Sequence, residues 1–313
     1  MPDKSSDECA MNVSPSFQYA YSTISIRYFD ALLADIDKLD RDGKLSTNTV
    51  YRKYLNHAKF QIPESTTDFQ SVIIVAVPGS PMLVNFHFKG AKHEIMLPPN
   101  YYDDGLTEED LCRTIQNDVI QTPGYSIERA KHVYLKLLAV RSGLGRYGRN
   151  NICYVEGMGS LPALYAFFTD FRFKSDNWLE IKMMDMCEEC EACIRQCPTG
   201  CLSKADFVID AGKCLTLYNE IKGEFPGWID PQAHNALMGC MKCQQCCPAN
   251  RGVLRRSGRI AEVTEKETES ILNESLDDET ANSLSDKLRM FSPEDAHHFL
   301  PILARNLRVL LFR

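Results

Sequence analysis

The spacing of the cysteines constrains this chain more than any other feature of its sequence. Two runs, each ended by a proline, and one isolated cysteine make up the pattern: Cys187-x2-Cys190-x2-Cys193-x3-Cys197-Pro198, Cys240-x2-Cys243-x3-Cys247-Pro248, and Cys214 between them. Three closely spaced thiols can surround three corners of a cube, but the local chain cannot easily supply a fourth. The proline fixes φ and turns the chain away. Each run therefore needs a cysteine from elsewhere in the chain to complete its site.

The first run has the ligand spacing of bacterial ferredoxins, in which the cysteine before proline binds the other of two clusters. This spacing predicts two complete four-thiolate sites, each holding a 4Fe–4S cluster. The first set is Cys187, Cys190, Cys193 and Cys247. The second set is Cys197, Cys214, Cys240 and Cys243. Cys201 and Cys246 are left over; Cys246 could replace Cys247, although the following proline favours Cys247.

Two other uses of the cysteines fit the pattern less well. Zinc sites usually combine two CxxC units, whereas the first run has four evenly stepped cysteines. Disulfides belong to oxidising compartments, and the polar, acidic start of the chain lacks the apolar core of a signal peptide. The longest apolar run, Val72–Val77, is too short to span a bilayer. We therefore expect a cytoplasmic protein without membrane contact.

The composition is typical of a globular protein with room for two or three domains. Of 313 residues, 44% are hydrophobic and 25% are charged. The net charge of −7 gives no general reason to expect nucleic acid or an anionic membrane as a partner. After the second cysteine run, however, four arginines follow closely: Arg251, Arg255, Arg256 and Arg259. Such a run is usually a solvated face, but beside a redox centre it could hold an acidic partner or a phosphate backbone.

Hydrophobic periodicity and turn residues predict a chain that mixes helices and strands. Residues 1–22 are expected to be a poorly fixed arm. Helices are expected at about 26–39, 107–120 and 127–141 and from Ser292 onward, and strands at 69–77, 82–88, 92–97, 152–156 and 164–171. Residues 262–286 are expected to form an acidic, helix-prone linker. His87 and His93 lie on the expected hairpin, and we interpret them as packed or surface histidines rather than metal ligands.

A glycine-rich loop, Ser142–Asn151, is a second candidate site. Gly143, Gly145 and Gly148 satisfy GxGxxG, but the dinucleotide fingerprint requires a strand before the loop and a helix after it. Here a helix is expected before and a strand after, so a dinucleotide site is rejected. Two interpretations stay open. The loop's N–H and guanidinium groups could surround an anionic ligand, or the loop could be a helix C-cap followed by a tight turn.

Several segments, taken in order, resemble the epoxyqueuosine reductase family, whose wider kin include the corrinoid-containing reductive dehalogenases. They cover roughly Phe69 to the end of the chain. Arg141–Asn150 is similar to the family's RAGLGxxGKN loop, and Phe69–Pro78 resembles its first core strand. The strand ending in Thr169-Asp170, the whole cysteine array and the tail Leu303-Ala-Arg-Asn-Leu307 are also similar.

This resemblance implies an enzyme: a reductase in which electrons pass from a ferredoxin- or flavodoxin-type donor through two 4Fe–4S clusters to a bound cobalamin. It implies an α+β fold with an N-terminal α/β corrinoid-binding-like domain, a two-cluster ferredoxin-like domain and a short C-terminal helical tail, at residues 1–180, 181–255 and 256–313. Family members carry no protein histidine on cobalt. The residues implied to contact the cofactor are Arg141, Gly143, Gly145, Gly148, Arg149 and Asn150.

The chain departs from the family where the namesake enzymes carry a proposed acid, about a dozen residues before the loop arginine. That region reads Glu128-Arg-Ala-Lys-His132 and contains no aspartate. His132 is the candidate proton donor there, because imidazole titrates near neutral pH; it is equally well interpreted as an ordinary helix-face histidine. The substrate therefore stays open between a modified tRNA and a small molecule. Two alternatives remain: a non-catalytic electron carrier or reductive activator for a protein partner, and the same fold with a flavin or another tetrapyrrole.

Overall fold

The computed structural model describes residues 11–14, 17–57, 62, 67–174, 176–254 and 258–313. The chain forms two compact units, each assembled from separate stretches. Unit 1 comprises Met1–Leu45, Lys53–Pro78 and Leu106–Glu189, and unit 2 comprises Ser46–Arg52, Gly79–Gly105 and Cys190–Arg313. The division between the units falls inside the first cysteine run. The three continuous domains expected from the sequence stay a prediction.

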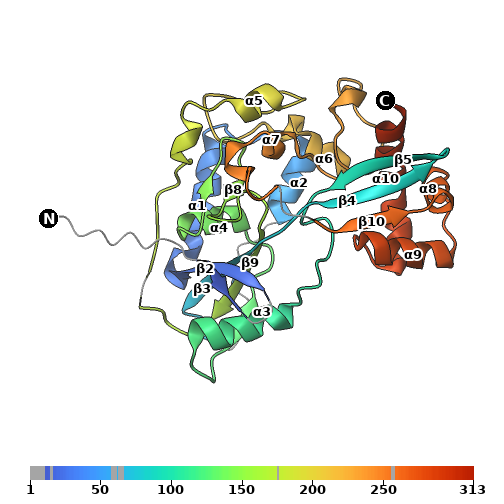
Figure 1. Ribbon diagram of the computed structural model, residues 1–313. Coiled ribbons are helices and arrows are strands. Elements are labelled where there is room, and N and C mark those ends of the chain that lie inside the picture. Colours follow the sequence, from blue (N-terminus) through green and yellow to red (C-terminus); the bar gives the residue numbers. More distant parts are fainter. Residues whose placement is uncertain (1–10, 15–16, 58–61, 63–66, 175, 255–257) are drawn as a thin grey trace. The chain divides into compact units, whose positions relative to one another are not determined.

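Unit 1 is built on a five-stranded sheet (Figure 1). Its strands, in spatial order, are β1 (Asn12–Val13), β2 (Gln18–Ser25), β3 (Ser71–Val77), β9 (Ala163–Thr169) and β6 (Ile127–Arg129). All neighbouring strands in this sheet run antiparallel. Strand β3 is buried at every residue. Both faces of the sheet are therefore covered, as its continuous apolar run indicates.

Helices cover the two faces of this sheet. On one face, α3 (Glu108–Thr114) and the π-helical turn η2 (Ile115–Ile120) pack against Ile73, Val75 and Phe167. Alternate residues of a strand point to opposite faces, and Phe168 meets Phe29 of α1 (Phe29–Arg41) at 5.3 Å between ring centroids. Helix α4 (Leu135–Arg141) lies against β3 and β9. The short hairpin of β7 (Arg146–Tyr147) and β8 (Cys153–Tyr154) follows it.

Unit 2 contains a three-stranded sheet in the order β10-β4-β5. Strands β4 (Met82–Phe88) and β5 (Ala91–Leu97) form the predicted hairpin. Its two-residue turn, Lys89-Gly90, has positive φ at both positions (51° and 73°), as tight hairpins of right-handed twist require. Strand β10 (Ile260–Val263) pairs with β4 in parallel.

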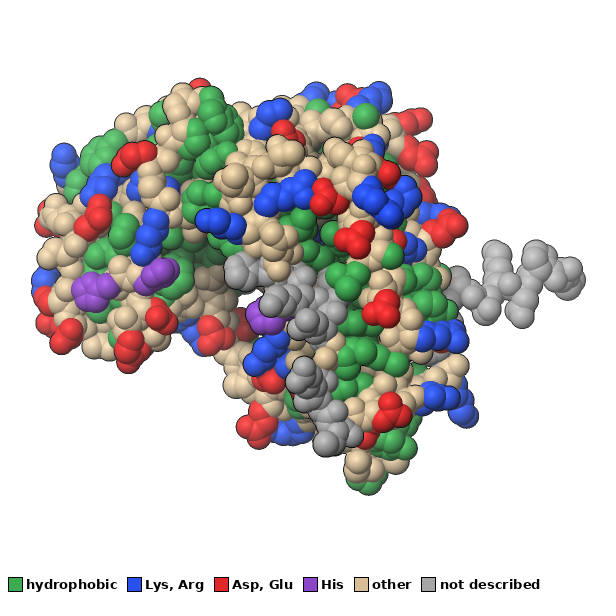
Figure 2. Space-filling view, turned by 180° about the vertical axis from the view of Figure 1, so that it is seen from behind, with side chains coloured by type: hydrophobic (Ala, Val, Ile, Leu, Met, Phe, Trp, Pro, Cys, Tyr) green, Lys and Arg blue, Asp and Glu red, His purple; other side chains and the backbone are tan. Residues whose placement is uncertain are grey.

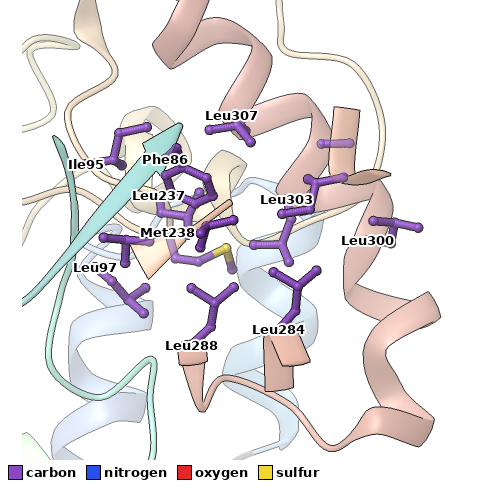
Figure 3. Close-up of a cluster of buried hydrophobic side chains, with 14 of the residues drawn as sticks. Phe86, Ile95, Leu97, Leu237, Met238, Leu284, Leu288, Leu300, Leu303 and Leu307 are labelled. Carbon is purple, nitrogen blue, oxygen red and sulfur yellow. The ribbon is translucent and has the colours of Figure 1, made fainter. Parts of the chain in front are cut away.

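Three C-terminal helices close the core of unit 2 over this sheet. They are α8 (Glu265–Leu272), α9 (Asp278–Leu288) and α10 (Ala296–Phe312). Figure 3 shows Phe86 and Leu97 from the sheet packed with Leu284 and Leu288 of α9 and with α10. The last helix contributes an apolar stripe to this core, where Leu303 and Leu307 are buried and Phe299 and Leu310 pack at its edge.

The cysteine-rich segment consists of very short elements separated by turns. They are η3 (Asp185–Cys187) in unit 1, and α5 (Ala192–Gln196), η4 (Ala211–Lys213), α6 (Leu215–Asn219), η5 (Pro231–Ala233), α7 (Lys242–Gln245) and η6 (Pro248–Asn250) in unit 2. The remaining helical elements are η1 (Ile26–Tyr28), α2 (Thr49–His57) and η7 (Pro293–Asp295). Helices α5 and α7, which carry the middle of the two cysteine runs, pack against each other.

The α+β fold is confirmed, but four parts of the prediction were wrong. Residues 18–22, the end of the expected arm, belong to β2, whose residues Ala20–Ser25 pair with β3. Residues 127–129 are not helical, because they pair with β9, and that pairing overrides the helical periodicity. The N-terminal unit is not α/β in the strict sense, since its sheet is antiparallel. The C-terminal tail is not purely helical, because it supplies β10.

Candidate iron–sulfur centre

Three of the four cysteines predicted for the second cluster lie close together in unit 2. Cys197 ends α5, Cys214 begins α6 and Cys240 precedes α7. Burial raises the pKa of the Cys240 thiol, and the nearby charges of Cys214 and Cys197 raise it further. Such an effect requires the three sulfurs to be neighbours. The structure therefore brings together residues that are up to 43 positions apart in the sequence, from Cys197 to Cys240.

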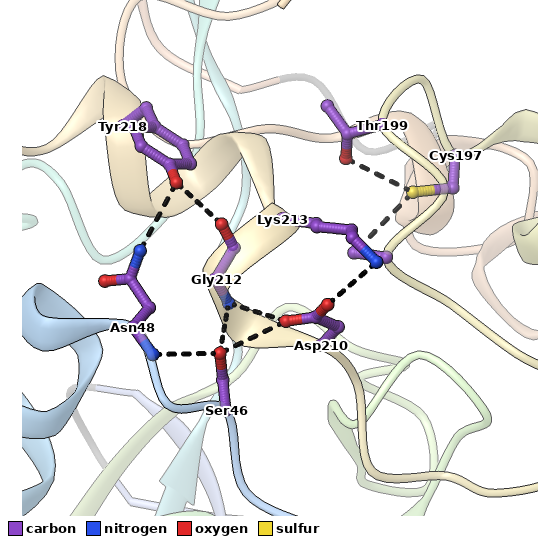
Figure 4. Close-up of polar contacts among 9 residues, drawn as sticks. Ser46, Asn48, Cys197, Thr199, Asp210, Gly212, Lys213 and Tyr218 are labelled. Carbon is purple, nitrogen blue, oxygen red and sulfur yellow. Dashed lines mark hydrogen bonds and ion pairs between the residues drawn. The ribbon is translucent and has the colours of Figure 1, made fainter. Parts of the chain in front are cut away.

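A polar network fixes the backbone just before Cys214 (Figure 4). The N–H of Gly212 donates to the side chains of Asp210 (3.1 Å) and Ser46 (3.2 Å), and the Ser46 hydroxyl donates to Asp210 (3.1 Å). From the far side, the Tyr218 hydroxyl donates to the Gly212 carbonyl (2.6 Å). These contacts hold η4 and so determine where the isolated cysteine enters the site. No local pattern predicts these contacts, because Ser46 is distant from Asp210 and Gly212 in the chain.

The sulfurs of this set accept several hydrogen bonds. The thiol of Cys201 and the N–H groups and hydroxyl of the Thr199–Cys201 turn lower the pKa of Cys197 to about 5. Hydrogen bonds from Cys201 and Thr216 lower the pKa of Cys214 to about 7. Asn235 Nδ2 donates to Cys240 Sγ at 3.2 Å. Because iron binds the thiolate and not the thiol, these contacts prepare the site for metal.

The cysteines predicted for the first cluster are divided between the units. Cys187 is the last residue of η3 in unit 1, whereas Cys190, Cys193 and Cys247 belong to unit 2. Burial raises the pKa of Cys246, and Cys247 and Cys190 raise it further, so these residues are neighbours. The Cys246 thiol donates to the Cys243 carbonyl at 3.5 Å. The choice of Cys247 over Cys246 stays a prediction.

No disulfide joins any of the twelve cysteines in the described part of the chain. Within the same residues, no group of three or more His, Cys, Asp or Glu side chains is arranged to hold a single metal ion. His87 and His93, which we interpret from the sequence as packed or surface histidines, both lie in the hairpin of unit 2. His87 Nε2 lies 2.8 Å from Glu262 Oε2 in unit 2, and His93 is half-buried opposite Phe86 in the hairpin.

The glycine-rich loop supports the start of the first cysteine run within unit 1. Arg149 is buried (4% exposed), and its Nε and Nη2 donate to the Cys187 carbonyl at 3.1 and 2.6 Å. The Tyr147 N–H donates to the Lys182 carbonyl (3.3 Å), and the Met184 N–H donates to the Tyr147 carbonyl (2.9 Å). The loop therefore holds residues 182–187 along its edge and positions the first predicted ligand.

The other arginine and the glycines of this loop also make contacts inside unit 1. Arg141 forms a two-pronged ion pair with Asp35 (2.5 and 2.8 Å) and lies over the Trp178 ring. Gly143 has φ +79° directly after α4, so the C-cap interpretation describes it. A Cβ on Gly145 would lie 2.5 Å from Cys153 Sγ, and one on Gly148 would lie 2.5 Å from the Tyr154 ring. These glycines permit close packing of the loop on β8.

Asn150 is the loop residue with an unused polar atom. Its Nδ2 donates to the Tyr154 hydroxyl (3.0 Å), but its buried Oδ1 has no hydrogen-bond partner among the described residues. A buried amide oxygen without a partner costs free energy, which a ligand donor can recover. A corrinoid with amide donors therefore fits the loop at Asn150 Oδ1. Arg141 and Arg149, the two arginines predicted to contact it, already have partners within the protein. The cofactor role of the six loop residues stays a prediction.

The region where the family carries its proposed acid holds no buried acid–base group in the described structure. His132 is exposed and adopts φ +62°, an uncommon backbone conformation for a residue other than glycine. Arg129 lies over the rings of Tyr165 and Phe167, at 4.6 and 5.2 Å from their centroids. The proton-donor role of His132 stays a prediction.

Of the four arginines that follow the second cysteine run, Arg251 and Arg259 are exposed, and Arg255 and Arg256 lie outside the described residues.

Arg305 and Asn306 of α10 contribute to the site in a way that sequence reasoning missed. Asn306 is fully buried, and its Nδ2 donates to the carbonyls of Asn219 and Leu237, both at 2.9 Å. Arg305 donates to the carbonyl of Tyr218 at 2.8 Å and also to those of Ile221 and Gly223. This pair of side chains, which we call the RN clamp, joins the segment after Cys214 to the segment before Cys240. The only sequence feature that pointed to these two residues was the family-like tail Leu303-Ala-Arg-Asn-Leu307.

We expect replacement of Arg149 by alanine to destabilise the protein by about 3 kcal/mol, because the buried Cys187 carbonyl would lose both of its hydrogen bonds from a charged donor. Lysine should not restore the effect fully, since it lacks the planar fork. Denaturant unfolding and iron content per chain measure the result, and the iron should fall. The matched control is Arg146→Ala in the same loop, whose ion pair with Asp185 is exposed and 3.4 Å long; it should cost below about 1 kcal/mol. Equal effects of the two variants would contradict the anchoring role.

Comparison with known proteins agrees with this geometry. Residues 186–250 match the family described as "4Fe-4S double cluster binding domain". The epoxyqueuosine reductase of Staphylococcus aureus is 31% identical over 118 residues, which are 38% of this chain and 30% of that enzyme. The one from Leadbetterella byssophila is 29% identical over 141 residues, 45% of either chain. The chain thus matches less than half the length of these curated relatives.

Solved structures share the fold over most of the chain. An epoxyqueuosine reductase structure from Bacillus subtilis, with a catalytic loop swung out of the active site, aligns with a TM-score of 0.61 and 18% identity, covering 93% of this chain and 76% of that one. An epoxyqueuosine reductase with a modified tRNA stem loop aligns with a TM-score of 0.58 and the same identity and coverage. The predicted resemblance and the double-cluster domain are confirmed. In the described part of the chain, no helix has the length and apolarity needed to span a membrane.

Proposed function

We propose that this chain is an iron–sulfur reductase of the epoxyqueuosine reductase type. The observation that carries the proposal is the convergence of Cys197, Cys214 and Cys240 inside a fold shared with solved epoxyqueuosine reductases. Two 4Fe–4S clusters at this position relay single electrons. A ferredoxin- or flavodoxin-type protein is the proposed donor, since such carriers deliver electrons one at a time.

The chain's own residues do three things in this function. The cysteines hold the clusters, and the hydrogen bonds to their sulfurs adjust how readily each cluster accepts an electron. Arg149 and the RN clamp fix the backbone that presents these cysteines. Asn150 offers a buried acceptor to the terminal cofactor, which we propose is a cobalamin with peripheral amide donors. When bound, cobalamin supplies a low-valent cobalt nucleophile for a two-electron reduction.

A modified tRNA is the proposed substrate, by analogy with the relative solved with a tRNA stem loop. Basic and acidic side chains alternate over the face seen in Figure 2, so among the described residues on this face no broad basic surface marks a tRNA site. If several arginines, including exposed Arg251 and Arg259, contact phosphates, tRNA affinity should fall steeply with added salt. A flat salt dependence would favour a small-molecule substrate instead.

One observation favours a second candidate, a non-catalytic electron carrier. Arg141 and Arg149, two of the residues predicted to bind the cofactor, are engaged with Asp35 and with the Cys187 carbonyl. A carrier would need the loop only as a support for the clusters. Its partner would be an acidic protein that meets the exposed arginines after the second cysteine run.

One experiment distinguishes the reductase from the electron carrier. Protein purified anaerobically is mixed with cobalamin, passed through gel filtration and denatured, and the absorption spectrum of the extract is recorded. The reductase proposal predicts that a corrinoid is retained and that the loaded protein reduces epoxyqueuosine in tRNA when a reductant is supplied. The variant Asn150→Ala should retain less corrinoid with unchanged iron. Protein that keeps two redox-active clusters but retains no corrinoid would overturn the reductase and leave the carrier.

A further inference from the structure

Cys201 is one of the two cysteines that the ligand pattern does not use, and the structure places it against the second predicted cluster. Its Sγ lies 3.5 Å from Cys197 Sγ. Cys214 is a second neighbour of this thiol. Cys197 and Cys214 come from different parts of the cysteine-rich segment, but both belong to the second set. Cys201 thus touches two ligands of one cluster.

The position of Cys201 is fixed from both sides within unit 2. The tight turn Cys197–Cys201 passes through Gly200 at φ +63° and folds the chain back under the Cys197 sulfur. The N–H of Asp210 donates to the Cys201 carbonyl at 3.0 Å, which ties the turn to the segment that leads into Cys214. Cys201 is 6% exposed. Water therefore has little access to the thiol, and the neighbouring sulfurs are its hydrogen-bond partners.

The thiol has one proton to donate, and its surroundings decide where the proton goes. When the second set binds iron, Cys197 and Cys214 have lost their protons and are acceptors only. A hydrogen bond across the 3.5 Å contact between the Cys201 and Cys197 sulfurs then has Cys201 as its donor, because a ligand sulfur can only accept. A hydrogen bond to a cluster sulfur withdraws electron density from it and stabilises the more negative, reduced state. The reduction adds one electron to the cluster and breaks no bond.

We propose that Cys201 is a positioning residue that raises the reduction potential of the second cluster by donating an S–H···S hydrogen bond to its ligands. This inference rests on the proposed function, because it requires that the second cluster is present. It makes the second cluster easier to reduce than the same four ligands would alone. The matched residue for comparison is Cys246, the other unused cysteine, whose thiol donates to a backbone carbonyl and not to sulfur.

Three variants of the full-length protein test the proposal: Cys201→Ala, Cys201→Ser and Cys246→Ala. Iron and acid-labile sulfide are measured first, followed by a redox titration monitored by electron paramagnetic resonance. In Cys201→Ala the midpoint potential of one cluster should become more negative. The ratio of reduced to oxidised cluster at fixed potential should fall by roughly threefold to tenfold, the effect of one hydrogen bond. Cys201→Ser keeps a donor and should restore most of the shift, and Cys246→Ala should leave both potentials unchanged.

Two results would overturn the proposal, and a third would overturn the function beneath it. A Cys201→Ala protein with full iron and an unchanged potential would show that the hydrogen bond has no electronic effect. Loss of about half the iron in Cys201→Ala would show that Cys201 is itself a ligand or is needed to form the site. Wild-type protein without a second cluster would instead contradict the proposed function, so the two failures are distinguishable.

Discussion

Replacing Cys214 with alanine is expected to remove one cluster and leave the other. Each cubane needs four thiolates, and Cys214 stands alone in the sequence, between Cys201 and Cys240. Iron and acid-labile sulfide should fall from about eight of each per chain to about four. The visible absorption of the clusters should fall in proportion. Chemical analysis of anaerobically reconstituted protein measures the change directly.

The control for this substitution is Cys246→Ala, which removes a thiol of the same region. Cys246 donates to the Cys243 carbonyl and belongs to neither predicted ligand set. Full iron in this variant, together with loss of a cluster in Cys247→Ala, would confirm the choice made from the proline that follows Cys247. The reverse result would show that Cys246 is the ligand. Full iron in Cys214→Ala would contradict the interleaved assignment itself.

Replacing Asn306 with alanine should have the largest effect on stability among substitutions far from the cysteines in sequence. The change leaves the carbonyls of Asn219 and Leu237 without their donor in a fully buried place and removes the amide oxygen that accepts from Arg305 at 2.8 Å. We expect a loss of about 3 to 5 kcal/mol. Because the RN clamp joins the segments that carry Cys214 and Cys240, occupancy of the second cluster should also fall.

Thermal unfolding and iron content of the same sample test this prediction. The matched control is Asn282→Ala on α9, which removes an exposed amide that donates to the Asp278 carbonyl at 2.7 Å. It should change stability by less than about 0.5 kcal/mol. An Asn306→Ala protein that unfolds like this control would show that the RN clamp does not hold the cluster segments.

The elements with strong local signals were predictable from the sequence. The hairpin turns at Lys89-Gly90, and α3 begins at the capping box of Thr107 and Asp110. Ser292 caps the turn that leads into the last helix. These features depend on residues close in the chain. The helix expected at 127–141 failed because its first residues pair with β9, a contact that local periodicity cannot report.

The parts of the candidate site that depend on the spacing of the cysteines were predictable. The parts that depend on contacts between distant residues were not. The eight proposed ligand cysteines came from their spacing alone. The glycine-rich loop was recognised as unlike a dinucleotide site, but its support of the Cys187 backbone through Arg149 could not be seen. The roles of Ser46, Cys201 and Asn306 depend on residues that meet only in the folded chain.

The most direct test of the account is the iron and acid-labile sulfide content of the wild-type protein after anaerobic reconstitution, measured against its concentration by amino-acid analysis. Eight ligands divided between two cubanes predict about eight iron atoms and about eight sulfides per chain, with two one-electron steps in a redox titration. Four of each, or none, would contradict the two interleaved sites and the reductase that depends on them.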